Sequence, residues 1–233
     1  MEVERNKIEN CLYVVPTPIG NLDDITLRAV KVLNEVDVIA AEDTRNSAQL
    51  LKNLGIKYNK LISYYDQIEA QRSEQIINMI ENGQSVALIS DAGMPLISDP
   101  GFKLVKLARE MEIKVVVLPG AVAFTVALAG SSFPVHRVTF VGFPPHKKGR
   151  ETFIKEMKEI KHTIIMYESS HRIMKLLKEI CKFIGEETEI CVARELSKIY
   201  EEYVIDKAIN VLQKFDKLPA IKGEFVVLIN NNE

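Results

Sequence analysis

The stretch "SVALISDAGMPLISDPG", residues 85–101, decides how the fold is interpreted. Residues 85–90 are an apolar run typical of a buried strand. The next eleven residues, 91–101, contain two aspartates, two glycines and two prolines. One short polar turn would be enough to leave a strand, so the length and composition of this loop need an explanation.

The rest of the N-terminal half repeats the pattern of a strand followed by a helix. Further apolar runs rich in Val, Ile and Leu cover residues 11–15, 36–41, 60–64 and 114–118. Helical periodicity covers residues 25–36, 47–54, 69–82 and 101–111. Strands that are apolar throughout need both faces covered, so we expect an α/β domain with a parallel-rich sheet.

The C-terminal half predicts a second α/β domain. Small polar residues and a proline at 130–137 interrupt the alternation, as a connection between lobes would. Strands are expected at 137–143, 162–168, 188–194, 201–206 and 224–229, and helices at 149–160, 172–184 and 207–215. The last strands are joined with little helix between them, which favours a mixed sheet. We therefore expect an N-terminal domain at 1–130 and a C-terminal domain at 131–233.

Composition limits the classes of function. Thirty basic and thirty-two acidic side chains give a formal charge of −2, so contact with a polyanion must be local. Cys11, Cys181 and Cys191 form no CxxC pair, which favours reduced thiols and no metal site. The charged N-terminus and the lack of about 18 consecutive apolar residues predict a soluble, cytoplasmic protein with no membrane partner.

Four strand ends of the N-terminal half lead into loops with Pro, Gly or small polar residues, at 16–26, 42–46, 91–101 and 119–123. Each alone could be an ordinary turn, but together they favour a small ligand held by backbone groups and a few carboxylates. Neither GxGxxG nor a P-loop motif is present, so the usual phosphate cradles are missing. Asp91 could accept hydrogen bonds from a ribose or a cation, or could cap its own turn.

Polar groups also follow the strands of the C-terminal half. Glu168 and Arg172, four residues apart, could be a simple helix pair or could lie at a helix start that favours a hydroxyl-rich ligand. The segment "GFPPHKKGRE", residues 142–151, is the one basic concentration. It could be a solvated loop, or it could track RNA phosphates with Phe143 available for base stacking.

Eight short strings occur in order between residues 17 and 229: "TPIGNLDDIT", "AEDTR", "ISDAGMPLISDPG", "LPGAVA", "FVGFPP", "YESSHR", "ARELSK" and "GEFVVL". Together they resemble the tetrapyrrole-methylase-like, S-adenosylmethionine-dependent methyltransferases. The closest resemblance is to the bacterial family that methylates the ribose 2'-hydroxyl of a cytidine in small-subunit ribosomal RNA. Ser170 stands where that family has proline in "YESPHR".

The resemblance implies two α/β lobes with an S-adenosylmethionine cleft between them, a homodimer, and ribosomal RNA or the assembled small subunit as substrate. The implied cofactor-binding residues are Pro18, Ile19, Gly20, Asp91, Ala92, Gly93, Met94, Val122, Ala123, Tyr167, Glu195 and Gly223. The residues expected to contact RNA phosphates are Lys147, Lys148, Arg150 and Arg172.

Methyl transfer to a ribose hydroxyl needs an aligned electrophile and a group that accepts the hydroxyl proton. The candidate general bases are Glu42, Asp43, Glu168, His171 and Glu195, each of which could equally be a structural partner. Two other functions stay open. One is methylation of a tetrapyrrole precursor of the corrin or sirohaem type, whose carboxylates would also suit the basic loop. The other is a non-catalytic module that binds a nucleotide or RNA.

Overall fold

The first sheet consists of five parallel strands in the order β3-β2-β4-β1-β5. It lies in the first of two units of the computed structural model, which describes residues 8–231; this unit ends at Val122 and the second begins at Ala123. The strands are β1 (Leu12–Val14), β2 (Val38–Ala41), β3 (Leu61–Ser63), β4 (Val86–Ile89) and β5 (Val115–Val117). The predicted parallel-rich sheet is confirmed.

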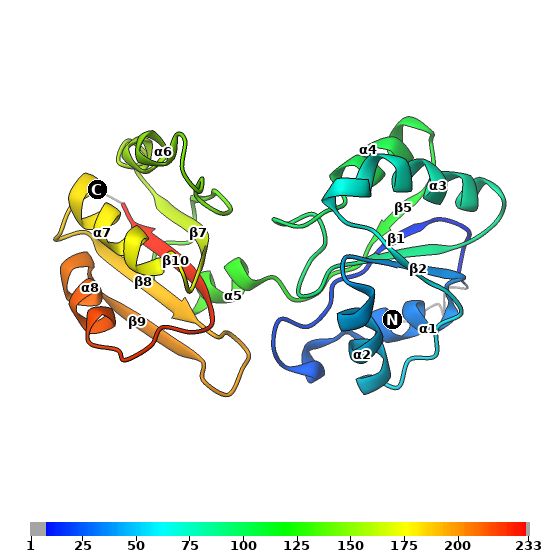
Figure 1. Ribbon diagram of the computed structural model, residues 1–233, viewed down its shortest axis with the longest axis horizontal. Helices are drawn as coiled ribbons and strands as arrows, with labels where there is room; N and C mark the ends of the chain where they lie inside the picture. Colours follow the sequence, from blue (N-terminus) through cyan, green and yellow to red (C-terminus); the bar gives the residue numbers. More distant parts are fainter. Residues whose placement is uncertain (1–7, 232–233) are drawn as a thin grey trace. The chain divides into compact units, whose positions relative to one another are not determined.

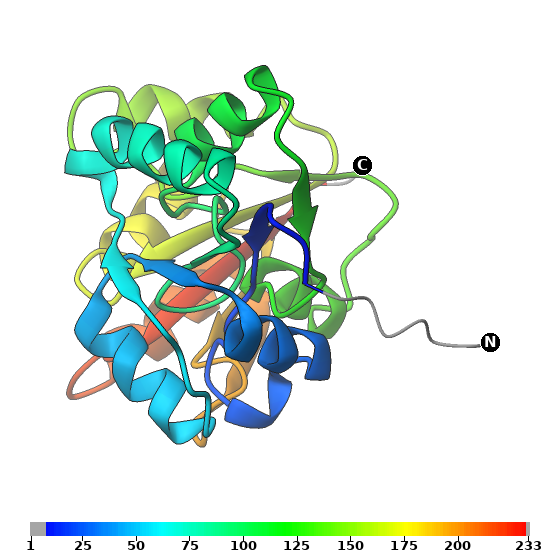
Figure 2. The same cartoon turned by 90° about the vertical axis from the view of Figure 1, so that its right-hand side faces the viewer.

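Helices cover both faces of this sheet, which explains why its strands are apolar throughout (Figures 1 and 2). Tyr13 and Val15 pack against α1 (Leu27–Glu35) and α2 (Thr44–Asn53). Leu12 and Val14 point to the opposite face and pack against α3 (Glu69–Glu81) and α4 (Phe102–Glu110). The 3-10 helices η1 (Leu22–Asp24) and η2 (Asp66–Ile68) lie in connecting loops. All loops that follow the strands therefore emerge at one edge of the sheet.

The second sheet has the order β6-β7-β10-β8-β9 and is mixed, as predicted. Only β6 and β7 pair in parallel, and the other neighbours are antiparallel. The strands are β6 (Val138–Phe140), β7 (Thr163–Ser169), β8 (Glu189–Arg194), β9 (Glu202–Lys207) and β10 (Glu224–Asn230). Side chains of α6 (Arg150–Met157), α7 (Ile173–Phe183) and α8 (Ala208–Asp216) form one core with this sheet.

Helix α5 (Ala123–Gly130) was not predicted, and it moves the boundary between the units. Its sequence "AFTVALAG" is apolar on nearly all sides, so it shows no amphipathic period. It packs on β7 and β10, and Tyr203 donates a hydrogen bond of 3.2 Å from its hydroxyl to the Val126 carbonyl. The division therefore falls one helix before the expected boundary at residue 130, because α5 is part of the second unit's packing.

The described helices include none that is both long and apolar enough to cross a membrane. Cys11, Cys181 and Cys191 are free thiols. Burial raises the pKa of Cys191 to about 12, so this thiol is inert at neutral pH.

Candidate active site

The loops that follow β1 and β4 are joined at the edge of the first sheet. Thr17 and Gly93 exchange two backbone hydrogen bonds, of 2.9 and 3.1 Å, and the Thr17 hydroxyl donates to the Ser90 carbonyl at 3.1 Å. Gly93 has a φ of +82°, and a Cβ there would lie 3.2 Å from Cγ2 of Ile19. Position 93 therefore needs glycine both for its backbone conformation and for the close approach of the neighbouring loop.

The loop after β5 completes this surface. A Cβ on Gly120 would lie only 2.5 Å from Cβ of Pro16, so the β5 loop lies directly on the chain leaving β1. We call residues 16–20, 91–94 and 119–122 the rim. Among the residues implied as cofactor contacts, the rim holds Pro18, Ile19 and Gly93 buried, Gly20, Asp91 and Ala92 exposed, and Met94 and Val122 half-buried.

Asp91 links the rim to helix α2. Its carboxylate accepts a hydrogen bond from the backbone N–H of Asp43 at 3.2 Å and from the amide of Asn46 at 2.7 Å. Both donors belong to the start of α2, so Asp91 holds the neighbouring loop and not its own turn. Its side chain is exposed, and each carboxylate oxygen can accept a further hydrogen bond.

Negative charge is concentrated beside Asp91. Burial, followed by the charges of Asp91, Asp66 and Asp43, raises the pKa of Glu42. Burial and the charge of Glu42 raise the pKa of Asp99 to about 7. We call Glu42, Asp66, Asp91 and Asp99 the acidic group. Asp99 was not among the candidate residues from the sequence. Because β2 and β4 are neighbours in the sheet, the loops that follow them lie side by side, and this adjacency is the signal that could have found Asp99.

The far end of the 91–101 loop is anchored by a buried carboxylate. Oε1 of Glu69, a residue only 6% exposed, accepts hydrogen bonds from the backbone N–H groups of Gly101 at 3.0 Å and Lys103 at 3.1 Å. Burial acts to raise the pKa of Glu69, but these hydrogen bonds outweigh it and the pKa is lowered. Glu69 thus caps α4 from another helix, because Gly101 has no side chain to do so.

Backbone conformations within this loop are unusual. Leu96 and Ser98 have φ values of +74° and +66°, in the left-handed region that such residues rarely adopt. Residues are held in this way where the surrounding structure imposes a fixed path, commonly at functional sites.

In the second unit, the strand register brings three segments to one edge of the sheet. Ser169 at the end of β7 pairs with Glu224, and Arg194 at the end of β8 pairs with Phe225, so both strands end where β10 begins. Glu195 follows β8, and its Oε1 accepts from the Glu224 N–H at 3.0 Å. A Cβ on Gly223 would lie 2.7 Å from Cγ of Glu195. The fold therefore brings the expected residues Glu195 and Gly223 into contact.

Tyr167 belongs to an aromatic cluster on the face of β7 away from α7. Its hydroxyl accepts a hydrogen bond of 3.2 Å from the N–H of Phe124, next to Ala123 at the start of α5. Its ring meets those of Phe140 and Phe143 edge to face, with centroids 5.0 and 5.5 Å apart. This geometry fixes where α5 begins relative to the second sheet.

The structure contradicts the expectation that Arg150 contacts RNA. Its side chain is 2% exposed, and it donates to Glu168 at 3.0 Å, to Glu179 at 2.8 Å and to the Pro145 carbonyl at 3.1 Å. Arg172, 17% exposed, pairs with the other oxygen of Glu168 at 2.8 Å and donates to the Pro144 carbonyl. We call Arg150, Glu168, Arg172 and Glu179 the buried ion network. It satisfies the donors that RNA phosphates would have used.

The same network contradicts Glu168 as a general base. Its side chain is fully buried and each of its oxygens accepts from an arginine, so it cannot reach a substrate hydroxyl. Asp43 is also a poor base, because its hydrogen bonds with Arg45 lower the pKa of Asp43 to about 2. Although burial acts to raise it, the pKa of Glu195 is lowered by bonds from the Glu224 N–H and Lys198. His171 is exposed in the second unit, and Glu42 remains the candidate within the acidic group.

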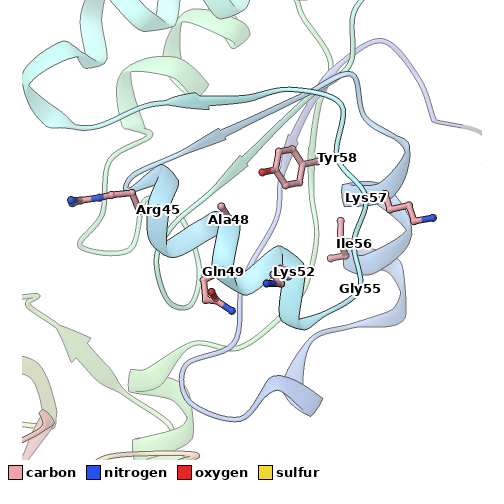
Figure 3. Close-up of a pocket in the computed structure, with 8 residues that line it drawn as sticks. All are labelled: Arg45, Ala48, Gln49, Lys52, Gly55, Ile56, Lys57 and Tyr58. Carbon is pink, nitrogen blue, oxygen red and sulfur yellow. The ribbon is translucent and has the colours of Figure 1, made fainter.

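A shallow groove of about 520 Å³ runs beside α2 in the first unit (Figure 3). Arg45, Lys52 and Lys57 lie along it together with Tyr58. No three His, Cys, Asp or Glu side chains in the described part of the chain are grouped in a way that could hold a metal ion.

Comparisons with known proteins agree with this architecture. Residues 11–210 match the family model described as Tetrapyrrole (Corrin/Porphyrin) Methylases. In fold, the chain is similar to cobalt precorrin-4 methyltransferase, a cobalamin biosynthetic enzyme, with a TM-score of 0.66, 17% identity and 94% of each chain covered. It is also similar to uroporphyrin-III-C-methyltransferase from Thermus thermophilus, with a TM-score of 0.63, 15% identity and 94% of each chain covered.

Two relatives named ribosomal RNA small subunit methyltransferase I are much closer in sequence. The one from Hydrogenobaculum sp. is 45% identical over 94% of this chain and 95% of the relative. The one from Thermotoga maritima is 40% identical over 95% of this chain and 99% of the relative. The chain is therefore a member of the tetrapyrrole methylase family and, within it, belongs to the methyltransferase family of ribosomal RNA small subunit methyltransferase I.

Proposed function

We propose that the protein transfers a methyl group from S-adenosylmethionine to the ribose 2'-hydroxyl of a cytidine in small-subunit ribosomal RNA. The observation that carries this proposal is the similarity, at 40–45% identity and over nearly the whole length, to relatives named for that RNA. The tetrapyrrole methyltransferases share the fold at 15–17% identity, which does not favour their substrates for this chain.

The rim suits the proposed cofactor. Gly93 and Gly120 remove side chains at two points of close approach, so backbone groups of three loops are presented together. The acidic group crowds negative charges that raise the pKa of Glu42 and Asp99, and a cation beside them would relieve this repulsion. S-adenosylmethionine carries a sulfonium and an ammonium, and Asp91 has free acceptor capacity for ribose hydroxyls. All the implied cofactor contacts stay predictions, those of the rim as well as Ala123, Tyr167, Glu195 and Gly223.

Glu42 is the residue that we propose as proton acceptor for the ribose hydroxyl. When bound, the cofactor supplies the electrophilic methyl group, so the chain's own residues need only orient the two reactants and accept a proton. A carboxylate with a raised pKa is a stronger base than a free one, which suits Glu42 to this role.

The Glu42→Gln substitution is expected to lower kcat about 100-fold or more, because the amide keeps the shape but cannot accept the proton. Cofactor affinity should fall by a much smaller factor, because Asp66 and Asp91 keep their negative charges. Single-turnover methyl transfer and calorimetric binding of S-adenosylmethionine measure the two effects. Asp43→Asn serves as the control, since Asp43 is already paired with Arg45. Equal losses of cofactor affinity and of rate in Glu42→Gln would assign Glu42 to binding.

Cofactor binding is expected to release protons near pH 6.5. The free protein holds a proton on Asp99 below its pKa of about 7, and a bound cation lowers that pKa. Affinity should therefore rise between about pH 5.5 and 7 and then level off, with roughly half a proton released per cofactor near pH 6.5. Calorimetry in buffers of different ionisation enthalpy measures this release. Asp99→Asn should abolish most of it, and S-adenosylhomocysteine, which lacks the sulfonium charge, should release less.

The direct test is transfer of tritiated methyl from S-adenosylmethionine to undermethylated small ribosomal subunits and to free RNA, followed by nucleoside analysis. Label in 2'-O-methylcytidine supports the proposal. If label enters only a tetrapyrrole precursor, the proposed RNA substrate is wrong. If the protein binds RNA without the cofactor and transfers no methyl group, it is a non-catalytic binding module. The proposed homodimer is tested separately by light scattering of the purified protein.

A further inference from the structure

Helix α7 carries a regular row of basic side chains on its exposed side. Lys175, Lys178 and Lys182 are spaced by three and four residues, which places them on one helical face about 10 Å long, and His171 lies in the turn that precedes the helix. The opposite face, with Ile173, Leu176, Leu177 and Ile180, is buried in the core of the second unit. The row is therefore held by a rigid, packed helix.

This row borders a groove of about 660 Å³ that is lined by residues of α7, of the start of α6 and of the loop before α6. Figure 1 shows the two helices in the second unit. We call it the α7 groove; the lining residues that matter here are Lys147, His171, Lys175, Lys178, Lys182 and Phe183. Two carboxylates also reach it, but both are already engaged. Glu179 pairs with the buried Arg150 and Glu151 pairs with Lys155.

Positive charge therefore remains uncompensated in the α7 groove. Lys147 and Lys178 take part in no ion pair with any residue of the part of the chain that the structure describes. Lys182 lies over the Phe183 ring at 4.7 Å, and Lys155 lies near the same ring at 5.0 Å. Because two ammonium groups surround it, this ring is not free to stack on a base. The groove therefore presents a row of positive charges but no aromatic ring on which a base could stack. This arrangement suits a phosphodiester backbone.

We propose that the α7 groove binds the phosphate backbone of the RNA substrate through Lys147, Lys178 and Lys182. This inference rests on the proposed function and replaces the expected contacts of Arg150 and Arg172, which are committed to the buried ion network. Glu179 pairs with the buried Arg150 at 2.8 Å and with Lys175 at 3.8 Å, so Lys175 is left out of the proposed phosphate contacts. Lys148, exposed beside Lys147, extends the same positive surface.

The test compares two double variants of the full chain that change the same charge on different units. Lys178→Ala/Lys182→Ala removes cations of the α7 groove, and Lys52→Ala/Lys57→Ala removes those of the groove beside α2. Affinity for unmodified small-subunit ribosomal RNA is measured by filter binding over salt concentrations of about 50–200 mM. Calorimetric binding of S-adenosylmethionine, expected to be unchanged, verifies that each variant is folded.

The expected result is about 10-fold to 100-fold weaker RNA binding for the α7 variant, with a salt dependence smaller by about 1.5 in log–log slope. The α2 variant should bind RNA like the wild type. Wild-type affinity in the α7 variant overturns the inference, and a loss confined to the α2 variant moves the RNA to that groove. If the wild type binds S-adenosylmethionine but neither binds nor methylates RNA, the proposed function itself fails, and this inference fails with it.

Discussion

The Glu168→Gln variant is expected to lose about 3 kcal/mol of unfolding free energy, near the lower end of the range for breaking a buried ion pair. The Glu168 side chain is fully buried and pairs with Arg150 at 3.0 Å and with Arg172 at 2.8 Å. Glutamine fills the same volume but removes the negative charge, which leaves Arg150 with Glu179 alone and Arg172 without a carboxylate. Urea unfolding followed by circular dichroism measures the loss.

The matched control is Glu151→Gln. Glu151 pairs with Lys155 at 2.7 Å, but both side chains are more than half exposed, so solvent screens the pair and its loss should leave the unfolding free energy close to that of the wild type. The two variants remove the same charge in the same unit and differ in burial. If Glu168→Gln unfolded like the wild type and lost only methyl transfer, Glu168 would be a catalytic residue and the structural role would be wrong.

The Gly120→Ala variant is expected to lose most cofactor binding and about 1–3 kcal/mol of stability, because one methyl group is added where no space exists. The new Cβ would lie 2.5 Å from Cβ and 2.8 Å from Cγ of Pro16, a rigid ring that cannot rotate away. The loops after β1 and β5 must therefore separate, which disrupts the rim. Calorimetry with S-adenosylmethionine and urea unfolding measure the two effects.

A second substitution distinguishes this clash from other effects of the alanine. Pro16→Gly removes both atoms that the new methyl group would meet, so the double variant Pro16→Gly/Gly120→Ala should bind the cofactor better than Gly120→Ala alone. Non-additivity of this kind is expected for residues in direct contact. If the loss of cofactor binding in the double variant equalled the sum of the losses in the two single variants, the clash between positions 16 and 120 would not be the cause of the loss in Gly120→Ala.

The strands could be predicted from sequence because buried strands leave a local signal. Runs such as residues 85–90 and 224–229 are apolar and bounded by breakers, and both are strands in the structure. Helix α5 could not be predicted, since its residues are apolar on nearly all sides and show no amphipathic period. It forms because Phe124 and Val126 find partners in Tyr167 and Tyr203, which lie far along the chain.

The loops that form the candidate site could be predicted from the sequence, but the partners of its charged side chains could not. Glycines and prolines at the strand exits signal the rim, because only a few residues tolerate its backbone geometry. Which carboxylate is paired, crowded or free depends on tertiary neighbours. Glu168 and Glu42 both follow apolar runs, yet one lies between two arginines and the other beside Asp91. Likewise, nothing near Glu69 in the sequence indicates that it caps α4.

The buried ion network also constrains how this protein can evolve. A mutation at Arg150, Glu168 or Arg172 alone leaves an ionised neighbour inside the protein without its partner, and selection for stability would remove most such variants. Replacing the network by a different set of side chains needs simultaneous substitutions, for example by apolar residues of similar volume. Orthologues should therefore keep the set intact or replace it together, and the positions should covary as a group.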